Sequence, residues 1–495
     1  MSDTILQAAA LVADPYVLWV CFAAAVFGIF VGAMPGLTAT MATALLVPIT
    51  FFMEPVPAVG AIVVATAMAI FAGDIPGAML RIPGTPASAA YTDEAYRLSR
   101  KGLLGQALGV NLVFSVAGGL VGVAILIIAA PILAEIALNF SSFEYFWLAG
   151  LGLTCAVFIA QSDALKGFAA LLIGLAIATI GIDPTAGHPR FTFGSVEMLQ
   201  GISFIPAMIG LFALSELLRG VVTIDRVGEM VQQQVGNVFR GLGQVWRRYW
   251  RNFVRGSMLG TGIGALPGAG ADIAAWISYA VSKRFSKEPE KFGTGHIEGI
   301  VDSTSANNAA VGAAWIPALV FGIPGDSITA IVIGVLYMKN MNPGPAVFLQ
   351  NPQLIYAVFI IFILANLMML PIGWAAIKLA RQILRTPRNI LLPMILLFCI
   401  VGSYAMTNSV YGIIIMLVLG VFGWILEENG FPVGPIILGM VLGELFEQSF
   451  MTSMIKADGS LLGFFSRPIA AALGVITLSL WAYMLTRSLW KRERA

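Results

Sequence analysis

Polar side chains gather after four short breaks in this otherwise apolar chain. Hydroxyl groups donate hydrogen bonds to carboxylate oxygens, and hydroxyl and carboxylate oxygens can bind a sodium ion, so such side chains suit a site for an anion together with a cation. The residues are, in chain order, Thr38, Thr40, Thr43, Thr85, Ser88, Asp272, Asp326, Ser327 and Thr329.

Two asparagines extend this set. Residues 302–308 form the most polar run that enters an apolar stretch, and Asn307 and Asn308 each offer amide donors together with an acceptor. We expect both to bind the substrate. The alternative for the pair is a helix N-cap, and for the Ser and Thr residues it is a hydrogen bond to their own helix.

Four aspartates in apolar surroundings are candidates for an ion or proton site. A carboxylate within a membrane is costly, and those that persist usually serve a function. The four are Asp74, Asp272, Asp302 and Asp326, and a position at the membrane interface is the alternative for Asp302.

The breaks are Pro-Gly pairs, and they occur twice. The octet at 32–39 returns at 264–271 with five of eight positions identical. A second pair of segments, 82–89 and 323–330, begins in both copies with Ile-Pro-Gly. Duplicated breaks within apolar segments are typical of secondary transporters built from two repeats around a central site.

A Pro-Gly pair ends one helix and lets another begin, because Pro lacks a backbone donor and Gly accepts unusual dihedral angles. The new helix presents unpaired N–H groups and the positive end of its dipole, which suit a carboxylate or a phosphate. We therefore expect four helix starts, at Pro35, Pro83, Pro267 and Pro324, to surround one anion. The alternative is that the accompanying glycines only let helices pack closely. These glycines are Gly28, Gly32, Gly260 and Gly264.

Composition predicts an all-α polytopic membrane protein. The 495 residues are 58% hydrophobic and 11% charged, and the mean hydropathy is +0.88. A membrane span needs about 20 apolar residues, and the chain contains many stretches of about this length. The first apolar stretch lacks the features of a cleaved leader and is expected to be retained. Cys21, Cys155 and Cys399 are scattered in apolar segments and are expected to pack rather than bind metal. We predict about 12 transmembrane helices, from stretches near 16–34, 37–53, 56–72, 108–130, 142–160, 164–182, 199–219, 256–282, 308–338, 353–377, 389–406, 409–426, 432–445 and 462–486.

The basic residues predict the orientation. Lys and Arg cluster at 97–101, 226–255, 283–291, 378–388 and 487–494, and by the positive-inside rule these clusters are cytoplasmic. The stretch 256–282 has basic residues on both flanks, so we expect a hairpin that turns at 266–268 and leaves on the same side. Its counterpart at 16–53 lacks flanking basic residues and would open to the other face. We therefore predict two inverted repeats, 1–221 and 256–495, joined by a basic amphipathic cytoplasmic connector at 222–255.

Five motifs resemble the large membrane subunit of tripartite tricarboxylate transporters, the TctA family. The likeness extends over nearly the whole chain. One departure is Asp326, which stands where family members commonly have Ser or Thr, and this difference can alter the charge of the preferred substrate. The motifs are Gly-Ala-Met-Pro-Gly at 32–36, Ile-Pro-Gly-Thr-Pro-Ala-Ser-Ala at 82–89, Phe-Gly-Thr-Gly-His-Ile-Glu-Gly at 292–299, Ser-Ala-Asn-Asn-Ala-Ala at 305–310 and Gly-Ile-Pro-Gly-Asp-Ser at 322–327.

The resemblance implies a permease of the bacterial inner membrane that works with a small membrane subunit and a periplasmic solute-binding protein. It also implies uptake of a di- or tricarboxylate driven by a sodium or proton gradient, with alternating access that is elevator-like. No cofactor is expected apart from a coupling sodium ion. Substrate contacts are expected at Pro35, Gly36, Thr38, Gly84, Thr85, Ser88, Pro267, Gly268, Asn307, Asn308, Gly325 and Ser327. The coupling cation is expected at Asp272, Asp326, Thr40 and Thr329, together with unwound backbone carbonyls.

Other functions fit the sequence less well. Helix N-termini and hydroxyl groups could equally bind another small organic or inorganic anion. An intramembrane aspartyl protease would need two matched Asp motifs, whereas the one near Asp272 has the wrong spacing. The chain lacks a Walker motif for ATP. The basic aromatic stretch at 240–251 is expected to anchor at the membrane rather than bind nucleic acid, and His188 and His296 are expected to be solvated.

Overall fold

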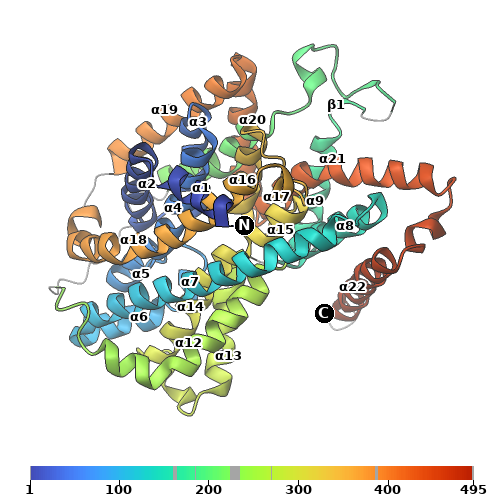
Figure 1. The fold of residues 1–495 in the computed structure, drawn as a ribbon. Coiled ribbons are helices and arrows are strands. Elements are labelled where there is room, and N and C mark those ends of the chain that lie inside the picture. The colour runs from blue at the N-terminus through green and yellow to red at the C-terminus, as the bar shows by residue number, and fades with distance from the viewer. Residues whose placement is uncertain are drawn as a thin grey trace.

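The computed structural model describes residues 2–159, 164–183, 186–222, 235–268, 270–384 and 388–492. Within these ranges the chain is mostly helical (Figure 1). One small antiparallel ladder pairs β1 (Gly181–Ile182) with β2 (Pro189–Arg190). Residues 223–234 of the predicted connector and the side chain of Cys155 lie outside the described residues.

The elements up to residue 222 include long apolar helices and short helices next to the first two breaks. Short 3-10 or π-helical segments carry the label η. The elements are α1 (Ser2–Val12), α2 (Pro15–Ala33), α3 (Ala39–Phe51), α4 (Pro55–Ala72), α5 (Asp74–Leu80), η1 (Ser88–Ala90), α6 (Thr92–Leu98), η2 (Ser99–Leu103), α7 (Leu104–Ala137), α8 (Ser142–Ile159), α9 (Ala164–Ala178), η3 (Glu197–Gln200), α10 (Phe204–Met208), η4 (Ile209–Leu214) and α11 (Ser215–Val222).

The elements after residue 235 begin with a helix that crosses the expected boundary between connector and second repeat. The elements are α12 (Leu242–Gly264), α13 (Gly270–Phe285), η5 (Pro289–Lys291), α14 (Ile297–Ala313), α15 (Trp315–Phe321), α16 (Ser327–Met338), α17 (Val347–Gln350), α18 (Pro352–Leu384), α19 (Arg388–Thr407), α20 (Val410–Glu428), α21 (Val433–Lys456), η6 (Leu461–Phe465) and α22 (Pro468–Arg492).

The helices make this a multi-pass membrane protein. Among the described residues, seven helical stretches are long and apolar enough to cross a membrane, and six further apolar helices are shorter. The predicted stretch 256–282 divides into the end of α12 and α13, and 308–338 divides into parts of α14, α15 and α16. The total of about 12 spans therefore stays a prediction, because several predicted stretches form broken or short helices.

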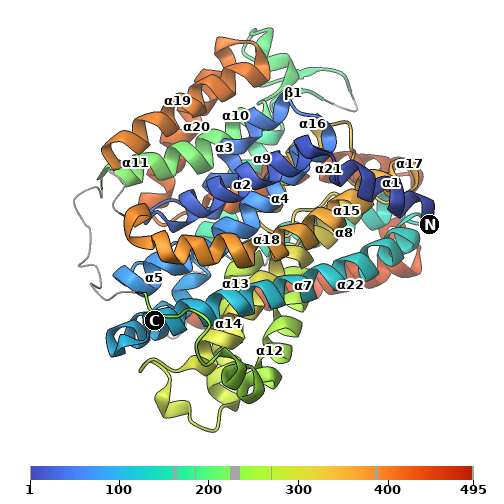
Figure 2. The ribbon, with the colours of Figure 1, turned by 60° about the vertical axis from the view of Figure 1, so that its left-hand side comes forward.

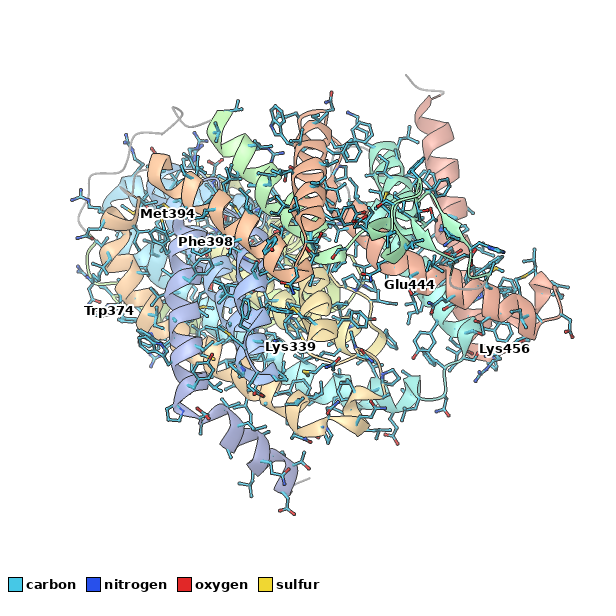
Figure 3. All side chains as sticks on the ribbon, turned by 90° about the horizontal axis from the view of Figure 1, so that it is seen from above. Lys339, Trp374, Met394, Phe398, Glu444 and Lys456 are labelled. Carbon is cyan, nitrogen blue, oxygen red and sulfur yellow. The ribbon has the colours of Figure 1, made fainter. Side chains whose placement is uncertain are left out.

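Many large apolar side chains are exposed, as expected of helices that meet lipid. Trp374 and Met394 are 43% and 50% exposed, and both lie toward the outer edge of the molecule (Figure 3). The helix α21 extends away from the main group of helices and ends at Lys456, and α22 returns beside α8 (Figures 1 and 3). An aromatic cluster that includes Trp147, Phe146 and Phe464 holds this extension together.

The packing of the first halves of the two expected repeats follows the same plan. A Cβ on Gly28 would lie under 3.0 Å from the backbone of Ala65, and a Cβ on Gly260 would lie equally close to that of Ala306. Gly32 and Gly264 likewise press against Ala69 and Ala310. The pair α2 and α4 therefore corresponds to α12 and α14, which lie together in Figure 2. Close helix packing is thus confirmed at the four glycines, whereas the inverted relation of the repeats remains a prediction.

Candidate functional site

Residues at or next to each of the four Pro-Gly breaks line one cavity of about 580 Å³. This volume lies within the range of small-molecule sites in proteins, about 300–1,000 Å³. The wall combines residues next to the breaks with residues from η4, α11, α20 and α21. Of the predicted site residues, those that line it are Gly36, Thr38, Thr40, Gly84, Thr85, Gly268, Asp272, Asn307, Asp326 and Ser327.

The first and third breaks require glycine. Gly36 has a φ of +86° and Gly268 a φ of +80°, a region that other residues rarely adopt. These turns let α3 and α13 begin beside the cavity. The hydroxyl of Thr38 accepts a hydrogen bond from the backbone N–H of Met41 at 3.1 Å, so it caps α3. The N-terminus of α3 therefore lies at the cavity wall.

The second and fourth breaks share a reciprocal cap. The backbone N–H of Thr85 donates to Oγ of Ser88 and the N–H of Ser88 donates to Oγ1 of Thr85, each at 3.1 Å. In the second copy, the N–H of Asp326 donates to Oγ1 of Thr329 at 2.8 Å, and the N–H of Thr329 donates to Oδ1 of Asp326 at 2.7 Å. Ser88 and Thr329 are buried behind the wall, so both hold the shape of a break.

Asp272 joins the two halves of the chain. Its Oδ1 accepts a hydrogen bond from the backbone N–H of Ala87 at 3.0 Å, and Trp276 on the next turn of α13 donates to the carbonyl of Pro86 at 3.2 Å. A Cβ on Gly270 would lie 2.7 Å from Cβ of Asp326. The second, third and fourth breaks therefore meet around these two carboxylates.

Asn307 connects the cavity to a buried polar chain. Its Nδ2 donates to the hydroxyl of Tyr91 at 3.3 Å, and that hydroxyl donates to Oδ1 of Asp74 at 2.6 Å. Oδ1 of Asn307 and Oδ2 of Asp74 are buried without a hydrogen-bond partner among the described residues. Such atoms are costly unless a ligand, ion or water pairs with them.

Several predicted site residues stand behind the cavity wall. Nδ2 of Asn308 donates to Oγ of Ser115 at 2.9 Å and to the carbonyl of Thr304 at 3.2 Å. Thr43 bonds to the carbonyl of Ala39 in its own helix at 2.8 Å. Both asparagines lie in the interior of α14, so the N-cap alternative is wrong for them. The other predicted residues that do not line the cavity are Pro35, Pro267 and Gly325.

Asp302 is held in a separate ionic cluster. Its carboxylate accepts hydrogen bonds from Arg255 at 2.7 Å, Asn252 at 2.8 Å and Ser282 at 2.6 Å. Its charge is thus compensated by the α12–α13 hairpin, away from the cavity lining.

The expectation of a solvated His296 is wrong. His296 is 9% exposed. The buried carboxylate of Glu94 accepts backbone hydrogen bonds from His296 and Gly295, both at 2.7 Å. The hydroxyl of Tyr279 donates to the same carboxylate at 2.7 Å.

Three charged residues of the cavity wall were not predicted from the sequence: Glu216, Arg219 and Glu427. Arg219 forms ion pairs with Glu427 at 2.9 Å and with Glu216 at 3.2 Å. The available signal was charge within apolar sequence, but Glu216 and Arg219 stand at the end of one predicted span and Glu427 just beyond another. Among the described residues, no group of three or more His, Cys, Asp or Glu could hold a metal ion.

Comparison with known proteins places these residues in a family. The sequence profile described as "Tripartite tricarboxylate transporter TctA family" matches residues 18–438. The chain belongs to the TctA family. The matched range includes all four breaks and the charged wall residues, so the cavity is built within the TctA part of the chain.

Two relatives of this TctA chain come from Agrobacterium vitis. An uncharacterised 52.8 kDa protein of the TAR-I ttuC' 3' region is 34% identical over 464 residues, which cover 94% of this chain and 92% of that relative. An uncharacterised protein of the TAR-II ttuC' 3' region is 35% identical over 208 residues, which cover 42% of this chain and 86% of that relative. No solved structure matches the chain.

Proposed function

We propose that the chain is the permease subunit of a binding-protein-dependent secondary transporter that imports di- or tricarboxylates. The observation that carries the proposal is the convergence of four Pro-Gly breaks on one cavity. Helix starts at such breaks offer N–H groups to a carboxylate without a buried basic side chain. In this proposal Thr38, Thr85, Asn307 and Ser327 donate the side-chain hydrogen bonds.

The charge of the cavity supports cation coupling. Its described lining includes four acidic residues, Glu216, Asp272, Asp326 and Glu427, and one basic residue, Arg219. A substrate with two or three carboxylates would be repelled there unless cations entered with it. Asp272 and Asp326 are the proposed sites for that cation, a sodium ion or a proton, and Thr40 lines the same cavity.

Alternating access would follow from movement of the helices that begin at the breaks, relative to the rest of the protein. The cavity wall joins these helices to α11, α20 and α21, so a displacement of one group would open the cavity to one side of the membrane. An elevator-like motion of two inverted repeats is the proposed form.

Family membership supports the proposed partners and location. A transporter described as tripartite has two components besides this chain. We propose a small membrane subunit and a periplasmic solute-binding protein, in the inner membrane of a bacterium.

The test is uptake of labelled di- and tricarboxylates into proteoliposomes that contain the chain, its small subunit and its binding protein. We expect accumulation under a sodium or proton gradient without ATP. Uptake that requires ATP, or no uptake of any carboxylate by an assembled complex, would overturn the proposal. Accumulation of a different small anion in the same assay would support the alternative substrate class.

A further inference from the structure

We infer that Arg219 is a substrate-binding residue that exchanges Glu427 for a carboxylate of the substrate. The inference rests on the proposed function and assigns a new contact within its cavity.

The first step is that Arg219 lies in the cavity wall, where a substrate can reach it. It lies on α11, and its side chain is 34% exposed while lining the cavity. It is the one basic residue among the described residues of that lining. A planar guanidinium donates paired hydrogen bonds to a carboxylate, which makes arginine well suited to this recognition.

The second step is the set of carboxylates that lie against Arg219. Carboxylate oxygens of Glu216, Glu427 and Glu428 lie 3.2, 2.9 and 3.6 Å from its guanidinium nitrogens. Glu427 belongs to α20, which packs against α11. Side chains of this protein therefore present to Arg219 the same chemical group that the substrate carries.

The third step is that Arg219 and the breaks belong to different helices of the cavity wall. The Pro-Gly breaks supply helix N-termini from α3, α13 and α16, whereas Arg219 and Glu427 come from α11 and α20. A substrate with one carboxylate can occupy only one of these places. A dicarboxylate can occupy both, and so link the helices of the breaks to α11.

Replacement of Glu427 by the substrate keeps the charges compensated. Arg219 retains Glu216 as a partner, while the released Glu427 can accept a proton or pair with an entering cation. Exchange of one carboxylate for another costs less than removal of the arginine's partner altogether.

The test is the kinetics of Arg219→Gln and Glu427→Gln in the proteoliposome assay, after uptake by the unmodified complex has been shown. We expect Arg219→Gln to raise KM for dicarboxylates by about tenfold or more. Glu427→Gln should lower KM by about threefold, because the competing carboxylate is gone. Arg219→Lys should restore part of the affinity. Excess monocarboxylate should compete with a dicarboxylate more strongly in Arg219→Gln than in the unmodified chain.

A matched control exists outside the cavity. Arg190 pairs with Glu447 at 2.6 Å and with Asp183 at 3.5 Å, and Arg190→Gln and Glu447→Gln should leave KM unchanged. Opposite KM shifts for the two Arg219-pair variants support the inference, since loss of a purely structural ion pair would affect both variants alike. Unchanged KM in both variants, or equal loss of kcat in both, overturns it. If the unmodified complex takes up no carboxylate, the proposed function fails first.

Discussion

The backbone N–H of Ala87 donates to Oδ1 of Asp272 at 3.0 Å, which joins the second Pro-Gly break to the helix that follows the third. Residues 185 positions apart in the chain thus share one wall of the cavity. In the proposed function, the second oxygen of this carboxylate binds the coupling cation. We take this contact as the place where substrate and cation sites meet.

Asp272→Asn should remove the negative charge of the side chain and keep its structural hydrogen bond. The asparagine Oδ1 can still accept the hydrogen bond from Ala87, while the negative charge is lost. We expect uptake under a cation gradient to fall by about tenfold or more. The control is Asp458→Asn, at an exposed loop position with a φ of +46° that asparagine tolerates. Cation-dependent uptake that survives in Asp272→Asn would argue against a coupling role.

Replacement of Asn307 should change substrate binding, whereas replacement of Asn308 should change stability. Asn307→Ala removes a donor at the cavity wall, and we expect KM for carboxylate to rise by about tenfold. Asn308→Ala removes the bond to Ser115 behind the wall, so it should lower thermal stability in detergent with little change in KM. Uptake kinetics and melting curves of the two purified variants make the comparison, and a reversed pattern would show that the wall is assigned to the wrong asparagine.

Gly260→Ala should destabilise the α12–α14 contact. The new Cβ would meet the backbone of Ala306 at a distance that real Cβ atoms do not show, and overpacking typically costs about 1–3 kcal/mol. Gly262→Ala on the same helix is the control, because no atom of another helix lies within 4 Å of its added Cβ. Thermal melting should separate the two, and an equal midpoint for both variants would contradict the close packing.

Glu94→Gln should loosen the loop at 292–296. The loss of charge weakens hydrogen bonds from Gly295, His296 and Tyr279, and bonds to charged groups contribute about 1.5–3 kcal/mol. We expect a lower melting temperature and faster proteolysis in this loop. Glu290→Gln, an exposed neighbour, should behave as the unmodified protein. Unchanged proteolysis of Glu94→Gln would mean that backbone packing alone holds the loop.

The sequence predicted the breaks because their signal is local. Pro and Gly fix backbone geometry within a few residues, and the positive φ of Gly36 and Gly268 follows from that chemistry. The duplicated motifs also predicted that the breaks belong to one site. The role of a residue beside a break depends on contacts that the local sequence does not fix. Ser88 and Thr329 take part in caps, although their hydroxyl groups could equally well bind a ligand.

Long-range pairings could not be predicted from spacing. Arg219 and Glu427 are 208 positions apart, and each alone resembles a polar end of a span. The choice between Asn307 and Asn308 depends on the rotation of α14, because neighbours on a helix point about 100° apart. That rotation is set by packing against α7 and α12, and the sequence near Asn307 does not reveal this packing.

Protection of a cysteine at Ser327 by substrate tests the central claim most directly. Ser327 lines the cavity, so a chain with its three native cysteines replaced by alanine and carrying Ser327→Cys should react with a maleimide in the purified complex. Ser460→Cys, at an exposed turn, is the control. We predict that a di- or tricarboxylate, added with the coupling cation, slows alkylation at 327 by about fivefold or more and leaves 460 unaffected. Alkylation at 327 that no carboxylate slows, in a complex that still transports one, would contradict the account.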